Sequence, residues 1–157
     1  MDNGTTYELA LKQTRDTVKK NLNLFSKNAF DISILPGWAS LVAELLEDIQ
    51  LVIVGTNAKI QIVQIKEKFG SLRFYFGKEC LTQDQEAAIS TLVADAEAKS
   101  TKLCAICGDA GVRDSSTGWV SVRCEGHRTE QMLFSTEYDI TAFAQHEDAM
   151  AKLLKQY

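Results

Sequence analysis

Two pairs of metal-binding residue types in the second half of the chain constrain its fold more than any other feature. The members of each pair are separated by two residues, and sixteen residues lie between the pairs: Cys104, Cys107, Cys124 and His127. Two intervening residues allow a tight turn to direct both side chains at one ion, and zinc prefers four thiolate or imidazole ligands in a tetrahedron. The spacing therefore predicts one zinc ion bound by these four residues.

A set of three thiolates and one imidazole closes the coordination shell, whereas catalytic zinc keeps one position open for water. The chain also contains no deaminase signature, Gly-x-Ser-x-Gly elbow, Walker loop or His-Glu-x-x-His motif. We therefore expect a structural metal and no enzymatic activity. The main alternative is a redox pair of Cys104 and Cys107, but such pairs follow a strand and open a helix. Here a helix is expected before the pair, and glycines follow it.

The residues between the two pairs have the pattern of a small β-hairpin. Gly108 and Gly111 follow the first pair, and residues 112–113 and 119–123 can form two short strands. The second pair would then begin a helical turn. This order resembles a treble-clef finger, but a zinc ribbon would supply the same ligands, so both subtypes stay open. Trp119 is expected to cover this hairpin as an apolar lid, or to contact a protein if it is exposed.

Helical periodicity predicts four helices, over residues 6–27, 36–50, 82–99 and 139–155. Thr5 with Glu8 and Thr82 with Gln85 have the spacing of capping boxes. The apolar run 51–54 either extends the second helix or begins a strand.

Strict alternation over residues 71–77 predicts a half-buried strand with Leu72, Phe74 and Phe76 on its inner face. Residues 58–66 would be its hairpin partner, with the turn at 67–70 and a bulge near Ile62 and Val63. The chain is therefore expected to be one α+β domain. Its parts would be a helical and hairpin core (1–101), a zinc-finger segment (102–130) and a C-terminal amphipathic helix (131–157).

Charge and composition narrow the possible functions. The net charge of −4 and pI of about 5.2 argue against a dedicated duplex-DNA binder, which normally carries a basic surplus. The N-terminus lacks the pattern of a secretory signal, and no stretch approaches the ~20 apolar residues of a membrane span. We therefore expect a cytoplasmic protein that has no membrane association, and a compartment in which cysteines stay reduced.

The strands of the predicted hairpin carry the main candidate surface for a partner. Residues 59–78 contain five basic residues and few acids, and Tyr75 alternates with Arg73 on the polar face. Basic and aromatic residues on one sheet face can bind single-stranded nucleic acid, although a charged hairpin also protects a sheet edge from aggregation. Arg113, Arg123 and Arg128 add basic charge in the finger. The candidate partner-binding residues are Lys66, Lys68, Arg73, Tyr75 and Trp119.

Two further residues invite a chemical interpretation. His146 lies in the last predicted helix beside two acids, where a solvated position is more common than a general base or a fifth metal ligand. A hydrolase that uses the metal or His146 is the third hypothesis for function. Cys80 follows the hairpin and is expected to be a small buried or edge residue.

Several motifs together resemble a known family. They are Gly37-Trp38 at the start of a helix, the hairpin run from Ile65 to Tyr75, the helix end at 96–100, and the Cys-x-x-Cys-Gly-x-x-Gly, Gly-Trp and Cys-x-x-His elements. This combination resembles a widespread family of short bacterial and phage proteins to which we can attach no reaction. The resemblance spans residues 37–127. It implies a genomic context in which inhibitors, immunity proteins and anti-defence proteins are frequent.

The hypothesis that these observations favour is a non-enzymatic, zinc-stabilised module that binds another protein. The alternative is a nucleic-acid-binding zinc-finger protein that uses the basic hairpin at 59–78. Salt dependence of binding distinguishes them, because phosphate contacts weaken steeply as salt rises.

Overall fold

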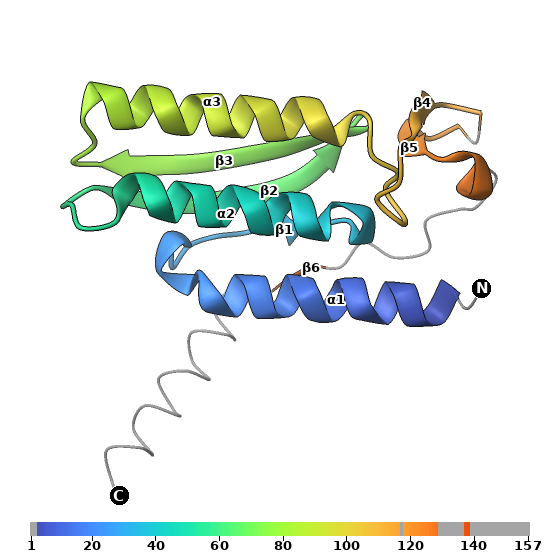
Figure 1. Ribbon diagram of the computed structural model, residues 1–157, viewed down its shortest axis with the longest axis horizontal. Coiled ribbons are helices and arrows are strands. Elements are labelled where there is room, and N and C mark those ends of the chain that lie inside the picture. Colours follow the sequence, from blue (N-terminus) through green and yellow to red (C-terminus); the bar gives the residue numbers. More distant parts are fainter. Residues whose placement is uncertain (1–2, 117, 129–136, 139–157) are drawn as a thin grey trace, which may run out of the picture.

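Three helices lie side by side over one face of a four-stranded sheet (Figure 1). The computed structural model describes residues 3–116, 118–128 and 137–138. The helices are α1 (Asn3–Lys20), α2 (Ala39–Ile53) and α3 (Gln83–Ser100). A second sheet of two short strands lies beyond the C-terminal end of α3, within the cysteine-rich segment. The predicted α+β class is confirmed.

The main sheet has the strand order β3-β2-β1-β6. Its strands are β1 (Ile32–Ser33), β2 (Lys59–Lys68), β3 (Ser71–Glu79) and β6 (Glu137–Tyr138). β1 runs parallel to β2 and antiparallel to β6. A parallel pair needs a crossover connection, which α2 provides between β1 and β2. β1 and β6 were not predicted, because two residues are too few to show a periodic pattern.

The hairpin of β2 and β3 forms as predicted, with its bulge in the expected place, but the predicted turn at 67–70 is too long, because β2 continues to Lys68. The pairing shifts between Ile62 and Gln64, which places the bulge at Val63 as expected. Phe69 and Gly70 form the two-residue turn, and their φ angles are 54° and 77°. Two positive φ values define the type I′ turn, whose twist matches that of the flanking strands.

The core lies between the helices and the inner face of this sheet. Trp38, Leu46 and Ile49 are fully buried on the α2 side. The sheet contributes Ile62, Ile65 and Leu72, and α3 contributes Ile89, Val93 and Ala96. Phe74 is also buried and Phe76 partly so, which confirms the predicted inner face of β3. Ala88, next to the buried Ile89, is exposed, so α3 buries only a narrow stripe of its surface.

The helix termini differ from the predictions where tertiary contacts decide them. α1 begins at Asn3, so Thr5 lies inside the helix and the predicted capping box with Glu8 is wrong. The predicted end at residue 27 is also wrong: α1 ends at Lys20, and a 3-10 turn, η1 (Leu22–Leu24), follows.

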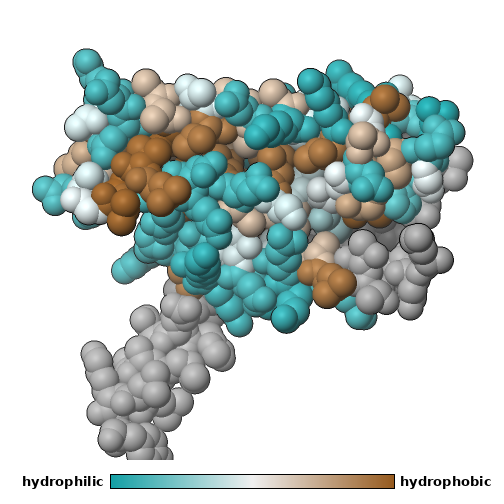
Figure 2. Space-filling view, viewed as in Figure 1, coloured by the Kyte–Doolittle hydropathy of each residue, from teal (hydrophilic) through white to brown (hydrophobic). Residues whose placement is uncertain are grey.

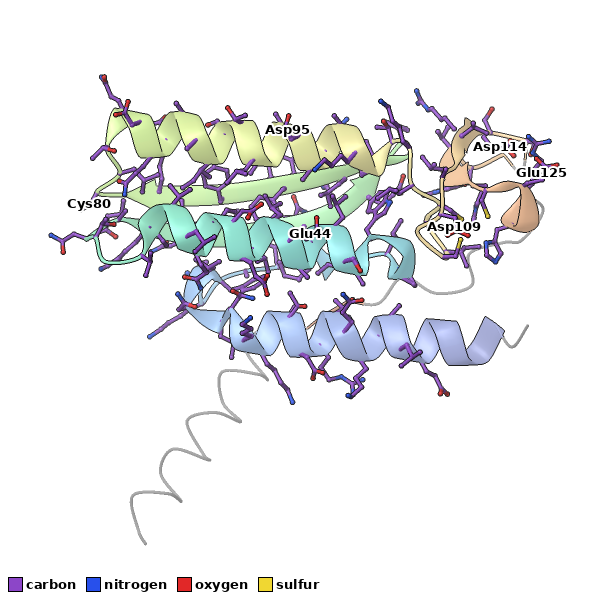
Figure 3. The ribbon with its side chains drawn as sticks, viewed as in Figure 1. Glu44, Cys80, Asp95, Asp109, Asp114 and Glu125 are labelled. Carbon is purple, nitrogen blue, oxygen red and sulfur yellow. The ribbon has the colours of Figure 1, made fainter. Side chains whose placement is uncertain are left out.

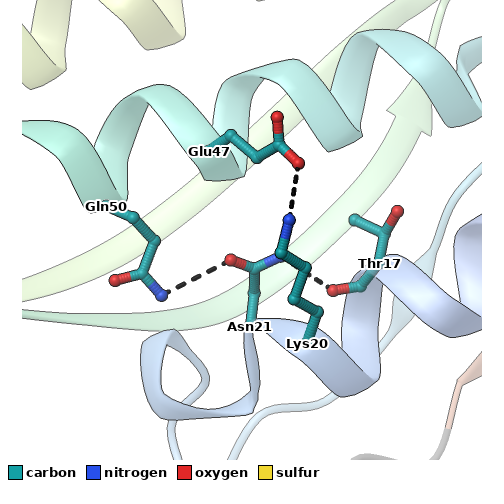
Figure 4. Close-up of polar contacts among 5 residues, drawn as sticks. All are labelled: Thr17, Lys20, Asn21, Glu47 and Gln50. Carbon is teal, nitrogen blue, oxygen red and sulfur yellow. Dashed lines mark hydrogen bonds and ion pairs between the residues drawn. The ribbon is translucent and has the colours of Figure 1, made fainter.

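The buried Asn21 explains this early end (Figure 4). Its amide donates to Thr17 O at 2.9 Å and accepts from Gln50 of α2 at 3.4 Å. Lys20 pairs with Glu47 of α2 at 3.0 Å. These bonds hold α1 against α2 and direct the chain toward the sheet.

The other helix boundaries follow local signals. α2 is preceded by the 3-10 turn η2 (Pro36–Trp38) and continues to Ile53, so the run 51–54 extends the helix. Thr82 and Gln85 form the predicted capping box of α3. The predicted helix at 139–155, with His146, lies outside the described residues. Among the helices that the structure does describe, none has the length and apolar character needed to cross a bilayer.

Candidate metal centre

The four predicted metal ligands converge at one point beyond α3. Cys104 and Cys107 lie in the loop that follows this helix, whereas Cys124 precedes the single turn of η3 (Glu125–His127) and His127 is the last residue of that turn. Between the two pairs, β4 (Val112–Asp114) and β5 (Ser121–Arg123) form the predicted antiparallel hairpin. The ligand atoms all lie within 4.8 Å of one another. This Cys3His cluster can hold one metal ion.

The separations between ligand atoms fit tetrahedral coordination. Cys107 Sγ and Cys124 Sγ are 3.7 Å apart, and Cys104 Sγ and His127 Nδ1 are 3.6 Å apart. Four ligands at a Zn–S distance of 2.3 Å place sulfurs about 3.8 Å apart, by the geometry of a tetrahedron. Cys124 Sγ and His127 Nδ1 are somewhat closer, at 3.2 Å. A disulfide requires about 2.05 Å between sulfurs, so none joins these cysteines.

Backbone hydrogen bonds shape the first ligand pair into a knuckle. Gly108 N donates to Cys104 O at 2.9 Å, and Cys104 N donates to Asp109 O at 2.7 Å. Asp109 N points at Cys107 Sγ from 3.5 Å. The φ of +81° at Gly108 is the left-handed conformation that this tight return requires, and glycine adopts it without steric cost.

The thiols perturb one another strongly. Burial raises the pKa of Cys104, but backbone N–H groups of Cys107, Cys124 and Ile106, together with the His127 ring, outweigh it and lower that pKa to about 7. Burial raises the pKa of Cys107 to about 12, and the neighbouring Cys104 and Cys124 add to the rise. Three thiolates in one cluster repel one another, whereas a bound divalent cation stabilises all of them.

The knuckle packs against the core through Gly37, a contact that the sequence did not reveal. Gly37 N donates to Ala105 O at 2.9 Å, and Ala105 is only 1% exposed. A Cβ on Gly37 would lie 1.9 Å from Cys104 O and 2.8 Å from Gly108 N. Trp38 Nε1 also donates to Leu103 O at 3.4 Å. The motif Gly37-Trp38, singled out in the resemblance, therefore docks the knuckle.

The tip of the β2–β3 hairpin contacts the same segment from another side. Val122 is fully buried, and its Cγ2 would lie 3.5 Å from a Cβ on Gly70. Arg113 Cγ lies 3.7 Å from the same position. The turn of the β2–β3 hairpin and the segment that carries the Cys3His cluster are therefore in contact.

Several candidate residues of this region lie elsewhere than expected. Trp119 is 70% exposed, which is the condition under which a contact with a protein was expected for it. The three arginines differ in exposure and in their partners. Arg123 is buried and donates to Ser121 Oγ at 3.0 Å, Arg128 approaches Glu125 at 3.7 Å, and Arg113 is exposed. Cys80, at the other end of the molecule (Figure 3), follows the edge strand β3 and is exposed, so the edge alternative of its prediction holds and the buried one does not.

The remaining candidate partner residues share one face of the main sheet. Lys66 and Arg73 are directly opposite each other, and Gln64 is opposite Tyr75. Lys68 flanks the turn and Tyr75 is 44% exposed. Lys78, counted with them in the sequence, lies on the other face, where it pairs with Glu86 of α3.

An apolar surface lies at the opposite end of the helical layer, where α2 ends and α3 begins (Figure 2). Leu51 is 72% exposed and Val54 is 71% exposed. The run 51–54 is apolar in the sequence, but only the structure shows that the side chains of Leu51 and Val54 face outward.

Comparison with known proteins gives no family. Neither the models of protein families, nor the curated proteins, nor the solved structures contain a match to this chain. The resemblance inferred from the motifs therefore stays a prediction.

Proposed function

We propose that the chain is a non-enzymatic protein-binding module whose Cys3His cluster holds one structural zinc ion. Two observations support zinc. The donor set is three thiols and one imidazole, and the 3.7 Å between Cys107 Sγ and Cys124 Sγ is close to the distance between two sulfurs bound to one tetrahedral zinc ion. The four ligands complete the coordination shell, so bound zinc would hold the knuckle against Gly37 and leave no position for substrate.

The observation that favours a protein partner is the apolar surface of Leu51 and Val54. Large contiguous exposed apolar surfaces commonly mark interaction sites. Both side chains are more than 70% exposed, at the end of a helix whose other large apolar residues are buried or, for Val52, partly buried. This surface is the proposed contact.

The charge around this surface indicates the chemistry of the partner. α2 and α3 together carry seven acidic residues and one lysine. Asp48, one turn before Leu51, and Asp84, in the first turn of α3, are close to the surface along the chain, whereas Glu44 and Asp95 lie nearer the middle of these helices (Figure 3). A complementary partner presents an apolar patch with basic residues around it. The context implied by the resemblance favours an inhibitor or immunity protein, in which binding blocks the activity of that partner.

The test is affinity capture from host extract with the zinc-loaded chain and two matched variants. The first variant combines Leu51→Ser with Val54→Ser. The control is Leu9→Ser, which removes an apolar side chain that is 62% exposed on α1. We expect one protein in stoichiometric amount with the wild type and the control, and its loss with the double variant. Equal capture by all three chains would exclude this surface as the contact.

A further inference from the structure

The charges of the protein are separated between its two faces, which the net value of −4 conceals. On the helical face, α2 and α3 carry seven acidic residues and one lysine, whereas α1 carries two acids and four bases. The outward side chains of β2 and β3 include four bases, Lys59, Lys66, Lys68 and Arg73, and one acid, Glu79. The other acid of the hairpin, Glu67, instead accepts a hydrogen bond from Gly70 N at 2.6 Å. In the described part of the chain, all three helices lie on the opposite face of the sheet.

The pairing of Lys66 with Arg73 lowers the stability of the folded protein when no ligand is bound. Like charges directly opposite in an antiparallel pair repel each other. Within the described residues, no carboxylate lies within ion-pair distance of Lys66, Lys68 or Arg73, and the only polar partner of Arg73 is Ser71 Oγ at 3.4 Å. A bound anion between these two cations would offset their repulsion.

The turn residue Phe69 also lowers the stability of the folded protein when no ligand is bound. It is 62% exposed and has a φ of 54°, a conformation that asparagine or glycine adopts much more readily than a bulky residue. Lys68 Nζ lies 5.6 Å from the centre of its ring, so an aromatic ring and a cation are side by side at the tip. Strained, exposed residues of this kind suggest a role in binding.

The metal-binding segment extends the same surface. Arg113 of β4 is exposed, and its Cγ lies beside the turn, 3.7 Å from the position of a Cβ on Gly70. The exposed bases of β2 and β3 and Arg113 of β4 therefore form one basic strip, which passes the turn at Phe69 and Gly70. Tyr75 provides a second exposed aromatic ring, two residues along β3 from Arg73.

We propose that this strip binds single-stranded nucleic acid, with the bases stacked on Tyr75 and Phe69 and the phosphates paired with Lys66, Lys68, Arg73 and Arg113. Exposed aromatic rings interleaved with cations are the usual means of holding single strands, whose bases are free to stack on them. The bases of a duplex are already stacked on one another. This activity is additional to the proposed protein binding, since it uses the other face of the molecule.

The test measures the fluorescence anisotropy of a labelled oligothymidine of about 12 nucleotides, a length within the usual range of such sites. The zinc-loaded full chain is compared with two triple variants that remove equal charge. The first is Lys66→Gln, Lys68→Gln and Arg73→Gln. The control is Lys12→Gln, Arg15→Gln and Lys99→Gln, three exposed positions on α1 and α3.

We expect the first variant to lose at least tenfold in affinity and the control to lose little. Each lost phosphate contact lowers the slope of log affinity against log salt by about 0.7, so the slope should fall by about 2. Phe69→Asn should weaken binding several-fold without lowering the unfolding temperature, which separates stacking from folding. Equal affinities for the two triple variants, or equal affinity for a duplex of the same length, would overturn the proposal.

Discussion

Gly37→Ala tests the contact that joins the metal centre to the core. The backbone of Gly37 is not in the left-handed region, so alanine there would ordinarily be neutral or slightly stabilising, because it reduces the entropy of the unfolded chain. The structure predicts the opposite sign. The new Cβ would meet Cys104 O at 1.9 Å, and ordinary contacts begin near 3.4 Å, so the knuckle must move by roughly 1.5 Å.

The expected loss of stability follows from this movement. Overpacking a close contact costs about 1–3 kcal/mol. The displaced knuckle also loses the 2.9 Å bond from Gly37 N to Ala105 O, which is worth about 0.5–1.5 kcal/mol. The free energy of unfolding should therefore fall by about 2–4 kcal/mol. In a domain of this size each kcal/mol corresponds to about 2–4 °C, so the unfolding temperature should fall by about 4–16 °C.

The assay is urea and thermal unfolding of the zinc-loaded protein, followed by circular dichroism. Gly126→Ala is the matched control, because Gly126 lies between two metal ligands and a Cβ there would meet nothing within 4 Å. We expect this control to stay within about 0.5 kcal/mol of the wild type. Both variants should retain one zinc per chain, since neither removes a ligand. If Gly37→Ala proves as stable as the control, the close contact does not exist in the folded protein.

Four further measurements follow. Cys104→Ser should lower zinc content well below one per chain, since three ligands hold the ion poorly; full stoichiometry would mean that the ligand set is wrong. Removal of zinc with a chelator should reduce hydrogen-exchange protection around η2 as well as in residues 104–127, because the buried Ala105 packs between them. A loss of protection confined to residues 104–127 would show that the two regions unfold independently. Phe69→Asn should raise the free energy of unfolding by about 1 kcal/mol, because asparagine adopts a positive φ with less strain than phenylalanine. A lower unfolding temperature in this variant would show that Phe69 is not strained. Ile65→Ala should cost about 2–5 kcal/mol in urea unfolding, as the residue is fully buried, whereas a loss below 1 kcal/mol would place it outside the core.

The parts that the sequence predicted correctly depend on neighbours close along the chain. The ligand pairs are recognisable because two-residue spacing is a local requirement for sharing an ion. The alternation of β3 and the capping box of Thr82 and Gln85 are equally local. These signals were sufficient for the metal cluster, the main hairpin and two of the three described helices with small errors at their ends.

The parts that only the tertiary structure decided depend on contacts between distant residues. β1 is a strand because Ile32 pairs with Ile65, and α1 ends early because Asn21 is held by Thr17 and by Gln50 of α2. In the sequence, Gly37 indicates only the start of a helix. Its close contact with residues 104–108 is visible only in the folded structure, because these residues are far apart along the chain.

The charge distribution shows the same division. Composition determines a net charge of −4, but the direction in which each side chain points determines the surface that a partner meets. Lys78 pairs with Glu86 of α3, whereas Lys66 and Arg73 face outward. The sequence by itself therefore determined the four residues of the Cys3His cluster and the class of fold. The tertiary structure decided which surfaces are basic, acidic or apolar, because the packing of the helices on one side of the sheet determines which residues are exposed.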